Sequence, residues 1–489
     1  MNTGDRADVR GFSARFLAAT AIAASAAGRV VAFGNRERIV FNRLSSLAAA
    51  LAFCAVCSVA DAGGNNRFGT GNSVGGVLVN AQGALETFTA LDQKKLNDML
   101  AEDFSPPSSA LKKPVELRKV SLKAVEAALK QLGNHHISEL PDEIKYLAGI
   151  QRIQFVLLYP ESNDIVIAGP GEGWKLDGKG SVVGITTGRP VLNLEDFVVA
   201  FRTVEAARKG QLSCSIDPTA EGRQRYEQLM KTQKTFNVGV VGAIEKAFGD
   251  QQITVSGVPD TSHFARVLVA ADYKMKRIGM KLEPSPVKGL VSFIDMAPAR
   301  LDNMMPRWWM ACNYEPLGKS DDGLAWELRG TGVKVQTEDE FVDNAAGTVK
   351  GSGKASPAAQ KWSEQFTAKY DELAVKEPVF GELRNVMDMC VIAALFSKEQ
   401  LAAKAKCELT ELTSTAGKAT IHSSTAPTKV ATQSSATKKG SNWIITASGG
   451  VSVNSWEAAD KSEASATAAA TREKARPSAG SAADGLWWN

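Results

Sequence analysis

Two neighbouring apolar runs, residues 153–159 and 165–168, form the clearest hydrophobic pattern in the chain. The polar segment 160–164 (PESND) joins them and is typical of a hairpin loop of four or five residues. Nearly every position of both runs is apolar, which indicates strands covered on both faces rather than strands with one face in water. We therefore expect a β-hairpin near the centre of a sheet, followed by the glycine-rich loop 169–173 (GPGEG).

The rest of the chain alternates between strand-like and helix-like patterns. In residues 121–132, for example, Leu122, Val125 and Leu129 share one helical face and Gly133 follows as a stop. Asp217 and Pro218 are typical of a helix cap and a first helical position. The predicted strands are 74–80, 84–89, 181–186, 190–192, 212–216, 253–258, 290–296, 308–314, 325–329 and 333–337, and the predicted helices are 91–100, 121–132, 194–208, 217–231, 238–248, 262–277, 357–375, 378–396 and 398–407. This mixture predicts an α+β fold, a mixed sheet with packed helices.

Composition divides the chain after its first 62 residues into four parts. Residues 63–73 are rich in Gly and Asn and are expected to form a flexible lead-in, and residues 74–344 to form the α+β core. A helical segment at 356–407 is expected to pack on that core. Residues 408–489 are rich in Ser, Thr, Ala and Lys, which predicts a disordered, low-complexity C-terminal tail with one short strand near 443–453.

Residues 1–62 have the pattern of a signal peptide with an over-long n-region. An uncharged apolar run begins at Leu44 and ends in Ala60-Asp61-Ala62, which predicts cleavage between Ala62 and Gly63. The run is shorter than the ~20 apolar residues of a membrane helix, so we expect export to the periplasm or medium and no transmembrane span in the mature protein. An uncleaved anchor helix is the alternative, and the length of the n-region leaves the true translation start open.

Charge and cysteine content exclude some classes of protein. The net charge of the whole chain is +4, but residues 1–62 contain seven arginines and four acidic residues, so the remainder is close to neutral. A neutral chain lacks the basic surface of a nucleic-acid-binding protein. The four cysteines after residue 62 are too few for a disulfide scaffold, and buried free thiols are favoured, although a bridge between neighbouring helices is left open. They are Cys214, Cys312, Cys390 and Cys407.

Few motifs of known chemistry are present. A P-loop needs Ser or Thr directly after its lysine, whereas Gly180 follows Lys179. The four histidines lack the spacing of a zinc site, so neither a metal nor a cofactor is expected. His263 is predicted in the first turn of a helix, and a Ser-His-Asp site that uses it stays open because triad members need not be close in sequence.

A carboxylate pair brought together by folding leaves no sequence motif, so hydrolysis by such a pair is the enzyme class that the sequence excludes least. Several acidic residues, among them Asp196, Asp260 and Asp295, lie at or near predicted element ends, where catalytic groups are usually presented. Trp174 follows the glycine loop, and core packing is favoured for it over stacking on a sugar. The candidate ligand-binding residues are Gly169, Gly171, Glu172, Gly173, Trp174, Asp217 and His263.

Several sequence segments, occurring in a fixed order, give the chain a family resemblance. Among them are YLAGIQRIQFVLLYPESNDIVIAGPGEGW, TTGRPVLNLEDFVVAFR, CSIDPTAEG and SGVPDTSHFARVLVAADYKMKRIGM. It resembles an exported protein family of planctomycete bacteria known as domain of unknown function 1598. The resemblance covers residues 74–396 and the short strand near Ser448. It implies an envelope or secreted location, and it brings no activity, fold or catalytic residue.

These observations favour a non-enzymatic binding or structural component of the cell envelope, with an envelope protein or polysaccharide as its partner and no nucleic acid. The alternative is a hydrolase of envelope polysaccharide or peptide that uses a carboxylate pair. Two acidic groups in one concave pocket near residues 169–174 would favour the enzyme, whereas a flat or apolar face carrying Trp174 would favour binding.

Overall fold

The computed structural model describes residues 73–476, apart from 88–93, 96–97, 99–100, 102–103, 211, 234–237, 299–305, 344–347, 352 and 440. The chain divides into two compact units, residues 1–66 and 67–489, and every described residue belongs to the second. The predicted signal peptide and its cleavage site lie outside the described residues. The description below concerns the second unit alone.

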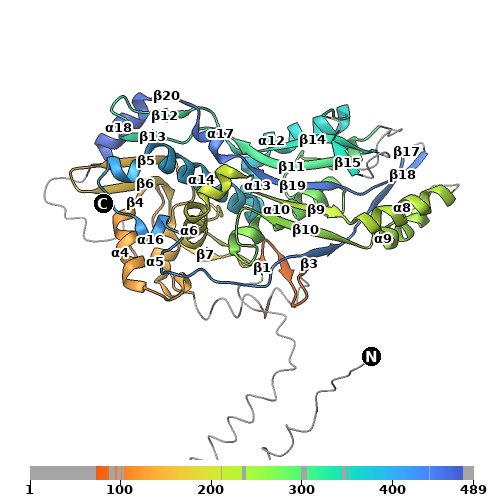
Figure 1. Ribbon diagram of the computed structural model, residues 1–489, viewed down its shortest axis with the longest axis horizontal. Helices are drawn as coiled ribbons and strands as arrows, with labels where there is room; N and C mark the ends of the chain where they lie inside the picture. The colour runs from red at the N-terminus through yellow and green to blue at the C-terminus, as the bar shows by residue number, and fades with distance from the viewer. Residues whose placement is uncertain are drawn as a thin grey trace, which may run out of the picture. The chain divides into compact units, whose positions relative to one another are not determined.

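The predicted α+β class is confirmed, with strands distributed over two large mixed sheets (Figure 1). The larger sheet has ten strands in the order β1-β2-β3-β16-β10-β9-β19-β11-β14-β15, and only the β3/β16 and β19/β11 pairs are parallel. Its strands are β1 Ser73–Val74, β2 Val77–Val79, β3 Ala84–Thr87, β9 Leu212–Pro218, β10 Asp250–Ser256, β11 Pro306–Asn313, β14 Gly332–Asp343, β15 Thr348–Gly351, β16 Lys429–Ala431 and β19 Ser448–Val453.

The predicted hairpin lies inside the second sheet, which has six strands in the order β20-β12-β13-β5-β6-β4. Leu157 on β5 pairs with Val166 on β6, and both are fully buried. The strands are β4 Val115–Ser121, β5 Phe155–Tyr159, β6 Asp164–Gly171, β12 Leu317–Lys319, β13 Ala325–Glu327 and β20 Ser462–Ala464, and two small hairpins are formed by β7 Trp174–Leu176 with β8 Val182–Gly184 and by β17 Ser435–Lys439 with β18 Ser441–Ile445. The interior position of β5 and β6 explains why both runs are apolar throughout.

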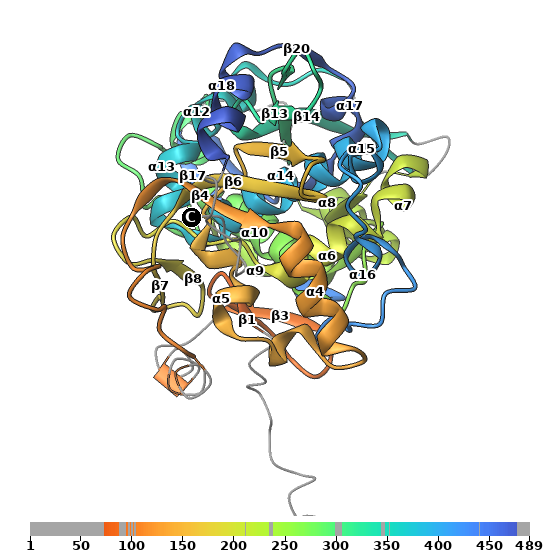
Figure 2. The same ribbon diagram turned by 90° about the vertical axis from the view of Figure 1, so that its left-hand side faces the viewer.

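Two long helices form the centre of the unit. α10 (His263–Gly279) packs on β9 and β19 of the larger sheet, and α14 (Pro378–Glu399) contacts α10 and α6. α14 lies between the other elements of the unit (Figure 2). Most of its residues are buried, as expected of a helix that is apolar on nearly every side. The other helices are α4 Leu122–Leu132, α5 Asp142–Lys145, α6 Leu194–Arg202, α7 Val204–Lys209, α8 Ala220–Thr232, α9 Val241–Phe248, α11 Phe293–Met296, α12 Pro357–Ala368, α13 Tyr370–Lys376, α15 Leu401–Lys404, α16 Thr410–Thr413, α17 Ser455–Ala459 and α18 Ala466–Ala475.

The C-terminal part of the chain contributes more structure than the single strand predicted near 443–453. β16 lies between β3 and β10, and β19 lies between β9 and β11, so both complete the larger sheet (Figure 1). β20 and α18 extend the smaller sheet and cover it. The segment 458–476, predicted to be disordered, is therefore regular in part, and residues 440 and 477–489 of the predicted tail lie outside the described residues.

Two local predictions are wrong. Asp217 does not cap a helix, because β9 continues to Pro218 and Thr219 caps α8 with its side chain, which accepts from the Gly222 amide. Residues 290–296, predicted as a strand, consist of three residues without regular structure, 290–292, and the short helix α11, which Ser292 caps. In both places a capping side-chain oxygen, of Thr219 or of Ser292, starts a helix at a position that the sequence pattern did not indicate.

The part of the chain that the structure describes contains no helix long and apolar enough to cross a bilayer. The four cysteines after residue 62 are free thiols, and Cys312 is less deeply buried than the other three.

Candidate functional site

A polar cavity of about 680 Å³ lies beside the N-terminal ends of α6 and α10. Its walls are the segment 138–146, which includes α5, the loop between β7 and β8, the first turns of α6 and α10, and the α14 face that carries Glu382, Asn385 and Met389. The volume falls within the ~300–1,000 Å³ of sites that hold small-molecule ligands. Five elements that are distant in sequence therefore meet around one concave space.

His263 and Asp196 form a hydrogen-bonded pair in this cavity. Ser262 caps α10 and places His263 at its first position, while Asn193 caps α6 and places Asp196 in its first turn. The Nδ1 atom of His263 lies 2.8 Å from one Asp196 carboxylate oxygen and 3.1 Å from the other. Donation from Nδ1 to the carboxylate leaves Nε2 as the acceptor of the neutral ring.

Burial and charge act in opposite directions on the imidazole. Burial alone would lower the pKa of His263, but the Asp196 carboxylate, through its charge and its hydrogen bond, and Glu382 raise it above the ordinary value. The Asp196 side chain is only 4% exposed, whereas that of His263 is 25% exposed because its ring faces the cavity. The ring is thus oriented from within the protein and open to a bound molecule.

Glu382 supplies a second titratable group to the same cavity. Burial raises the pKa of Glu382 to about 7, although the nearby His263 charge and a hydrogen bond with Ser181 act to lower it. His263 and Glu382 each affect the pKa of the other, so they titrate as a coupled pair. Near neutral pH the pair can therefore include a neutral His263, which acts as a base, and a protonated Glu382, which acts as an acid.

Three buried polar atoms of the cavity residues have no hydrogen-bond partner among the described residues. They are Arg266 Nε, Asn385 Oδ1 and Glu382 Oε2. Arg266 and Asn385 are 4% and 2% exposed, so their unpaired atoms lie in the protein interior. A buried polar group without a partner costs about 1–3 kcal/mol, and a bound molecule with both donor and acceptor groups would recover that energy.

The cavity lining carries more acidic than basic groups. Lys145 and Arg266 are its cationic side chains, and Lys145 already pairs with Asp142 at 2.5 Å. The acidic members are Glu139, Asp142, Glu195, Asp196 and Glu382. This excess disfavours an anionic ligand and is compatible with a neutral or cationic one.

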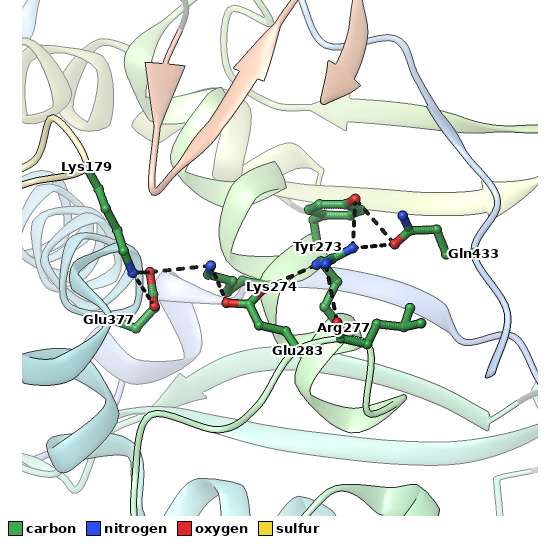
Figure 3. A network of polar contacts seen from close by, with 8 residues as sticks. Lys179, Tyr273, Lys274, Arg277, Glu283, Glu377 and Gln433 are labelled. Carbon is green, nitrogen blue, oxygen red and sulfur yellow. Dashed lines mark hydrogen bonds and ion pairs between the residues drawn. The ribbon is translucent and has the colours of Figure 1, made fainter. Parts of the chain in front are cut away.

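A chain of ion pairs holds the walls of the cavity together (Figure 3). Glu377, just before α14, accepts from Lys179 of the β7–β8 loop at 2.6 Å and lies 3.6 Å from Lys274 of α10. Lys274 also pairs with Glu283, which bonds Arg277 in turn. These bonds fix the loop that carries Ser181 and the helix that carries Glu382 relative to the helix that carries His263.

Of the seven residues that the sequence singled out, only His263 lines the cavity. Gly169 and Gly171 belong to β6. A Cβ atom on Gly169 would lie 2.0 Å from the Arg152 carbonyl oxygen, and one on Gly171 would lie 2.6 Å from Arg118 Cβ. A Cβ atom on Gly173 would lie 2.9 Å from Lys112 Cα. The glycines are therefore explained by close backbone packing.

The other three candidates have structural partners. Glu172 is 1% exposed, and it accepts from the Gln151 amide at 2.8 Å and from the Thr186 and Thr187 backbone amides at 2.9 Å each. Trp174 is also 1% exposed and meets Tyr146 edge to face, which leaves no open face for a sugar. Asp217 lies on β9 opposite Gln252.

Glu382, Arg266 and Asn385 were missed by the sequence reading. Glu382, Asn385 and Met389 recur at intervals of three and four residues, so they share one face of α14. A glutamate and an asparagine on a helix that is otherwise apolar around most of its surface are a recognisable signal for a buried polar site. In the described ranges, no group of three or more His, Cys, Asp or Glu side chains is arranged to hold a metal ion.

Comparison with known proteins adds a family match and no activity. No curated protein and no solved structure matches the chain. Residues 214–293, from β9 through α10 to the start of α11, match the family described as protein of unknown function (DUF1598), so His263 and Arg266 lie within the matched region.

Proposed function

We propose that this protein is a hydrolase that binds a polar, hydroxyl-bearing molecule in the 680 Å³ cavity and cleaves it by general acid–base catalysis. The observation that carries the proposal is the presence of the His263–Asp196 pair and Glu382 in one concave polar space. Catalytic sites are often cavities lined by titratable groups whose pKa values are shifted from their ordinary values.

In this mechanism His263 is the base. Asp196 holds the ring with Nε2 free to accept, and Nε2 takes a proton from a water molecule whose oxygen attacks the electrophilic carbon of the substrate. Glu382, protonated in part near neutral pH, gives its proton to the leaving group as the bond to that group breaks. Transfer of the proton from His263 to Glu382 through solvent restores the site, so one water is consumed in each cycle.

The cavity also supports a substrate class. The unpaired Arg266 Nε requires an acceptor and the unpaired Asn385 Oδ1 requires a donor, and a hydroxyl group supplies both functions. The acidic excess of the lining favours a neutral or amino-bearing molecule over an anionic one. A glycoside of neutral sugars or amino sugars has this chemistry.

The place of action is proposed from the sequence. The signal-peptide pattern of residues 1–62 supports export, and an exported hydrolase with such a cavity would act on envelope polysaccharide or peptide. The non-enzymatic binding role that the sequence favours is the competing hypothesis, because the same cavity could hold a ligand without turnover.

The test compares the wild-type chain with His263→Gln and Glu382→Gln on a panel of chromogenic neutral glycosides, amino-sugar glycosides and short peptides. We expect turnover of at least one glycoside, a bell-shaped pH profile with its maximum near neutral pH, and a loss of about 100- to 10,000-fold in kcat for either variant. His135→Gln is the matched control, because the His135 side chain is exposed, pairs with Glu139 and does not line the cavity.

Three results would contradict the hydrolase. They are a complete lack of turnover, equal activity of all variants, and an equal loss in the His135→Gln control. Saturable sugar binding by the wild type without turnover would instead support the non-enzymatic binding role.

A further inference from the structure

A second, smaller cavity lies on a different face of α14 and has the opposite electrostatic character. Its volume is about 240 Å³. It is lined by three arginines, one carboxylate and three uncharged residues: Arg152, Arg189, Arg384, Asp371, Gln151, Gln154 and Pro170. This is smaller than the ~300–1,000 Å³ of sites for drug-sized ligands, so it fits a small group. The catalytic proposal does not involve it.

Two of the three arginines, Arg152 and Arg384, have acidic side-chain partners. The Nε atom of Arg152 lies 3.0 Å from Asp388, which is buried, and another Arg152 nitrogen donates to the Gly330 carbonyl at 2.9 Å. Arg384 pairs with Asp371 at 2.6 Å. Arg189 is exposed at the cavity rim.

Arg384 has a buried donor that the described residues do not satisfy. Its Nε atom has no hydrogen-bond partner, although Arg384 as a whole is only 5% exposed. Gly332 lets Arg384 and Arg152 lie side by side, because a Cβ atom there would be 2.8 Å from Arg384 Cγ and 3.3 Å from a terminal Arg152 nitrogen. The Arg384 and Arg152 side chains thus both lie close to Gly332, and both line the cavity.

Asp371 would compete only weakly with a bound anion for the N–H donors of Arg384. Its side chain is 66% exposed, and an ion pair so open to water is stabilised little. An anion inside the cavity would be less hydrated and could reach Arg384, Arg152 and Arg189 together.

We propose that this pocket binds the oxyanion of a small molecule: a carboxylate, phosphate or sulfate group. Guanidinium groups match the planar carboxylate and the tetrahedral oxyanions through paired N–H donors. The pocket is separate from the acidic cavity and would take an anionic group, whereas the acidic cavity favours a neutral or cationic one.

Isothermal titration of the full chain with sodium sulfate, inorganic phosphate and acetate, at low ionic strength and constant pH, tests the proposal. We expect at least one anion to bind at one site per chain with a Kd of about 1 mM or tighter. Acetate binding without phosphate binding would identify a carboxylate ligand, and the reverse would identify a tetrahedral oxyanion.

Variants distinguish this pocket from the rest of the surface. Arg384→Met should weaken binding by about 10- to 100-fold, and Arg189→Met, which changes an exposed residue and should leave folding intact, by about 3- to 10-fold. Asp371→Asn removes the competing carboxylate and should tighten binding by about 2- to 5-fold. Arg223→Met on α8 is the control and should bind like the wild type.

The opposite signs expected for Asp371→Asn and Arg189→Met make the test selective. If none of the three anions binds, or if binding is the same in Arg189→Met, Asp371→Asn and the control, the proposal is overturned. Arg152 and Arg384 then serve only to hold their neighbouring elements together.

Discussion

Replacing Glu382 by glutamine should change how protein stability depends on pH. An ordinary glutamate titrates near pH 4.5, whereas burial raises the pKa of Glu382 to about 7 in the folded protein. The folded state therefore keeps this proton to a higher pH than the unfolded chain does. The resulting stabilisation is complete below about pH 4.5 and is lost as the pH rises through about 7.

The size of the effect follows from the two pKa values. At 1.36 kcal/mol per pH unit, the loss of stability between pH 4.5 and pH 8 is about 3 kcal/mol. Unfolding entropy is about 2.1 cal/mol/K per residue, so for roughly 400 structured residues this corresponds to a change in Tm of about 3–4 °C. Glutamine has the same shape and no charge, so Glu382→Gln should avoid this loss.

The assay is urea unfolding and thermal unfolding of both proteins at pH 5, 6, 7 and 8. We expect similar stability at pH 5 and a variant more stable by about 3 kcal/mol at pH 8. Glu364→Gln on α12 is the control, because Glu364 is exposed and bonds only Gln360. Asp272 adds a pH dependence of its own at lower pH, since burial raises its pKa to about 6, and this contribution should be the same in both proteins. Equal pH dependence in wild type and Glu382→Gln would refute the assignment of a raised pKa to Glu382.

Three further predictions concern the fold. Lys276→Met leaves the fully buried Asp272 without the cation that lies 2.8 Å away. The free energy of unfolding, measured in urea at pH 8, should fall by about 3–5 kcal/mol, and it should fall less at pH 5, where Asp272 is protonated. A decrease independent of pH would contradict this prediction. Gly449→Ala places a Cβ atom 1.8 Å from the Trp308 carbonyl oxygen at a φ of +123°, so it should separate β19 from β11 and cost at least about 3 kcal/mol by the same measurement. Gly178→Ala is the control, because Gly178 has open space around it and no positive φ. Ending the chain at residue 428 removes β16 and β19 from the larger sheet and should abolish soluble, protease-resistant protein, whereas ending it at residue 460 keeps both strands and should retain the fold; equal behaviour of the two would contradict the role of β19.

The hydrophobic pattern was enough to predict the elements that are apolar and long. The hairpin of β5 and β6, α10 and α14 all lie close to their predicted ranges. Burial on both faces leaves nearly continuous apolar runs in the hairpin, and α10 and α14 carry apolar residues at helical spacing. β16 and β20 were not predicted, because they have three residues each, KVA and SEA, and their positions depend on backbone pairing with strands more than 100 residues away. Short polar strands of this kind carry almost no local signal.

The candidate site was predictable only in part. His263 was identified from its place at a helix start, and Asp196 was among the acidic residues at predicted element ends. Their contact could not be predicted, because 67 residues separate them and packing of α6 against α10 brings them together. The glycine loop was misleading, since glycines needed for close strand packing and glycines that cradle a ligand look alike in sequence.

The central claim is that His263 and Glu382 carry out hydrolysis in the acidic cavity. Its most direct test is to incubate the wild-type chain with a polysaccharide and peptide fraction of cell envelope in H₂¹⁸O and to search for new products by mass spectrometry. For each bond cleaved by the wild type or by His135→Gln, we predict one ¹⁸O atom in the product that carries the attacked carbon and none in the leaving-group product. We predict that His263→Gln and Glu382→Gln form no such labelled product. Absence of labelled products from the wild type, or equal amounts from His263→Gln, would contradict the account.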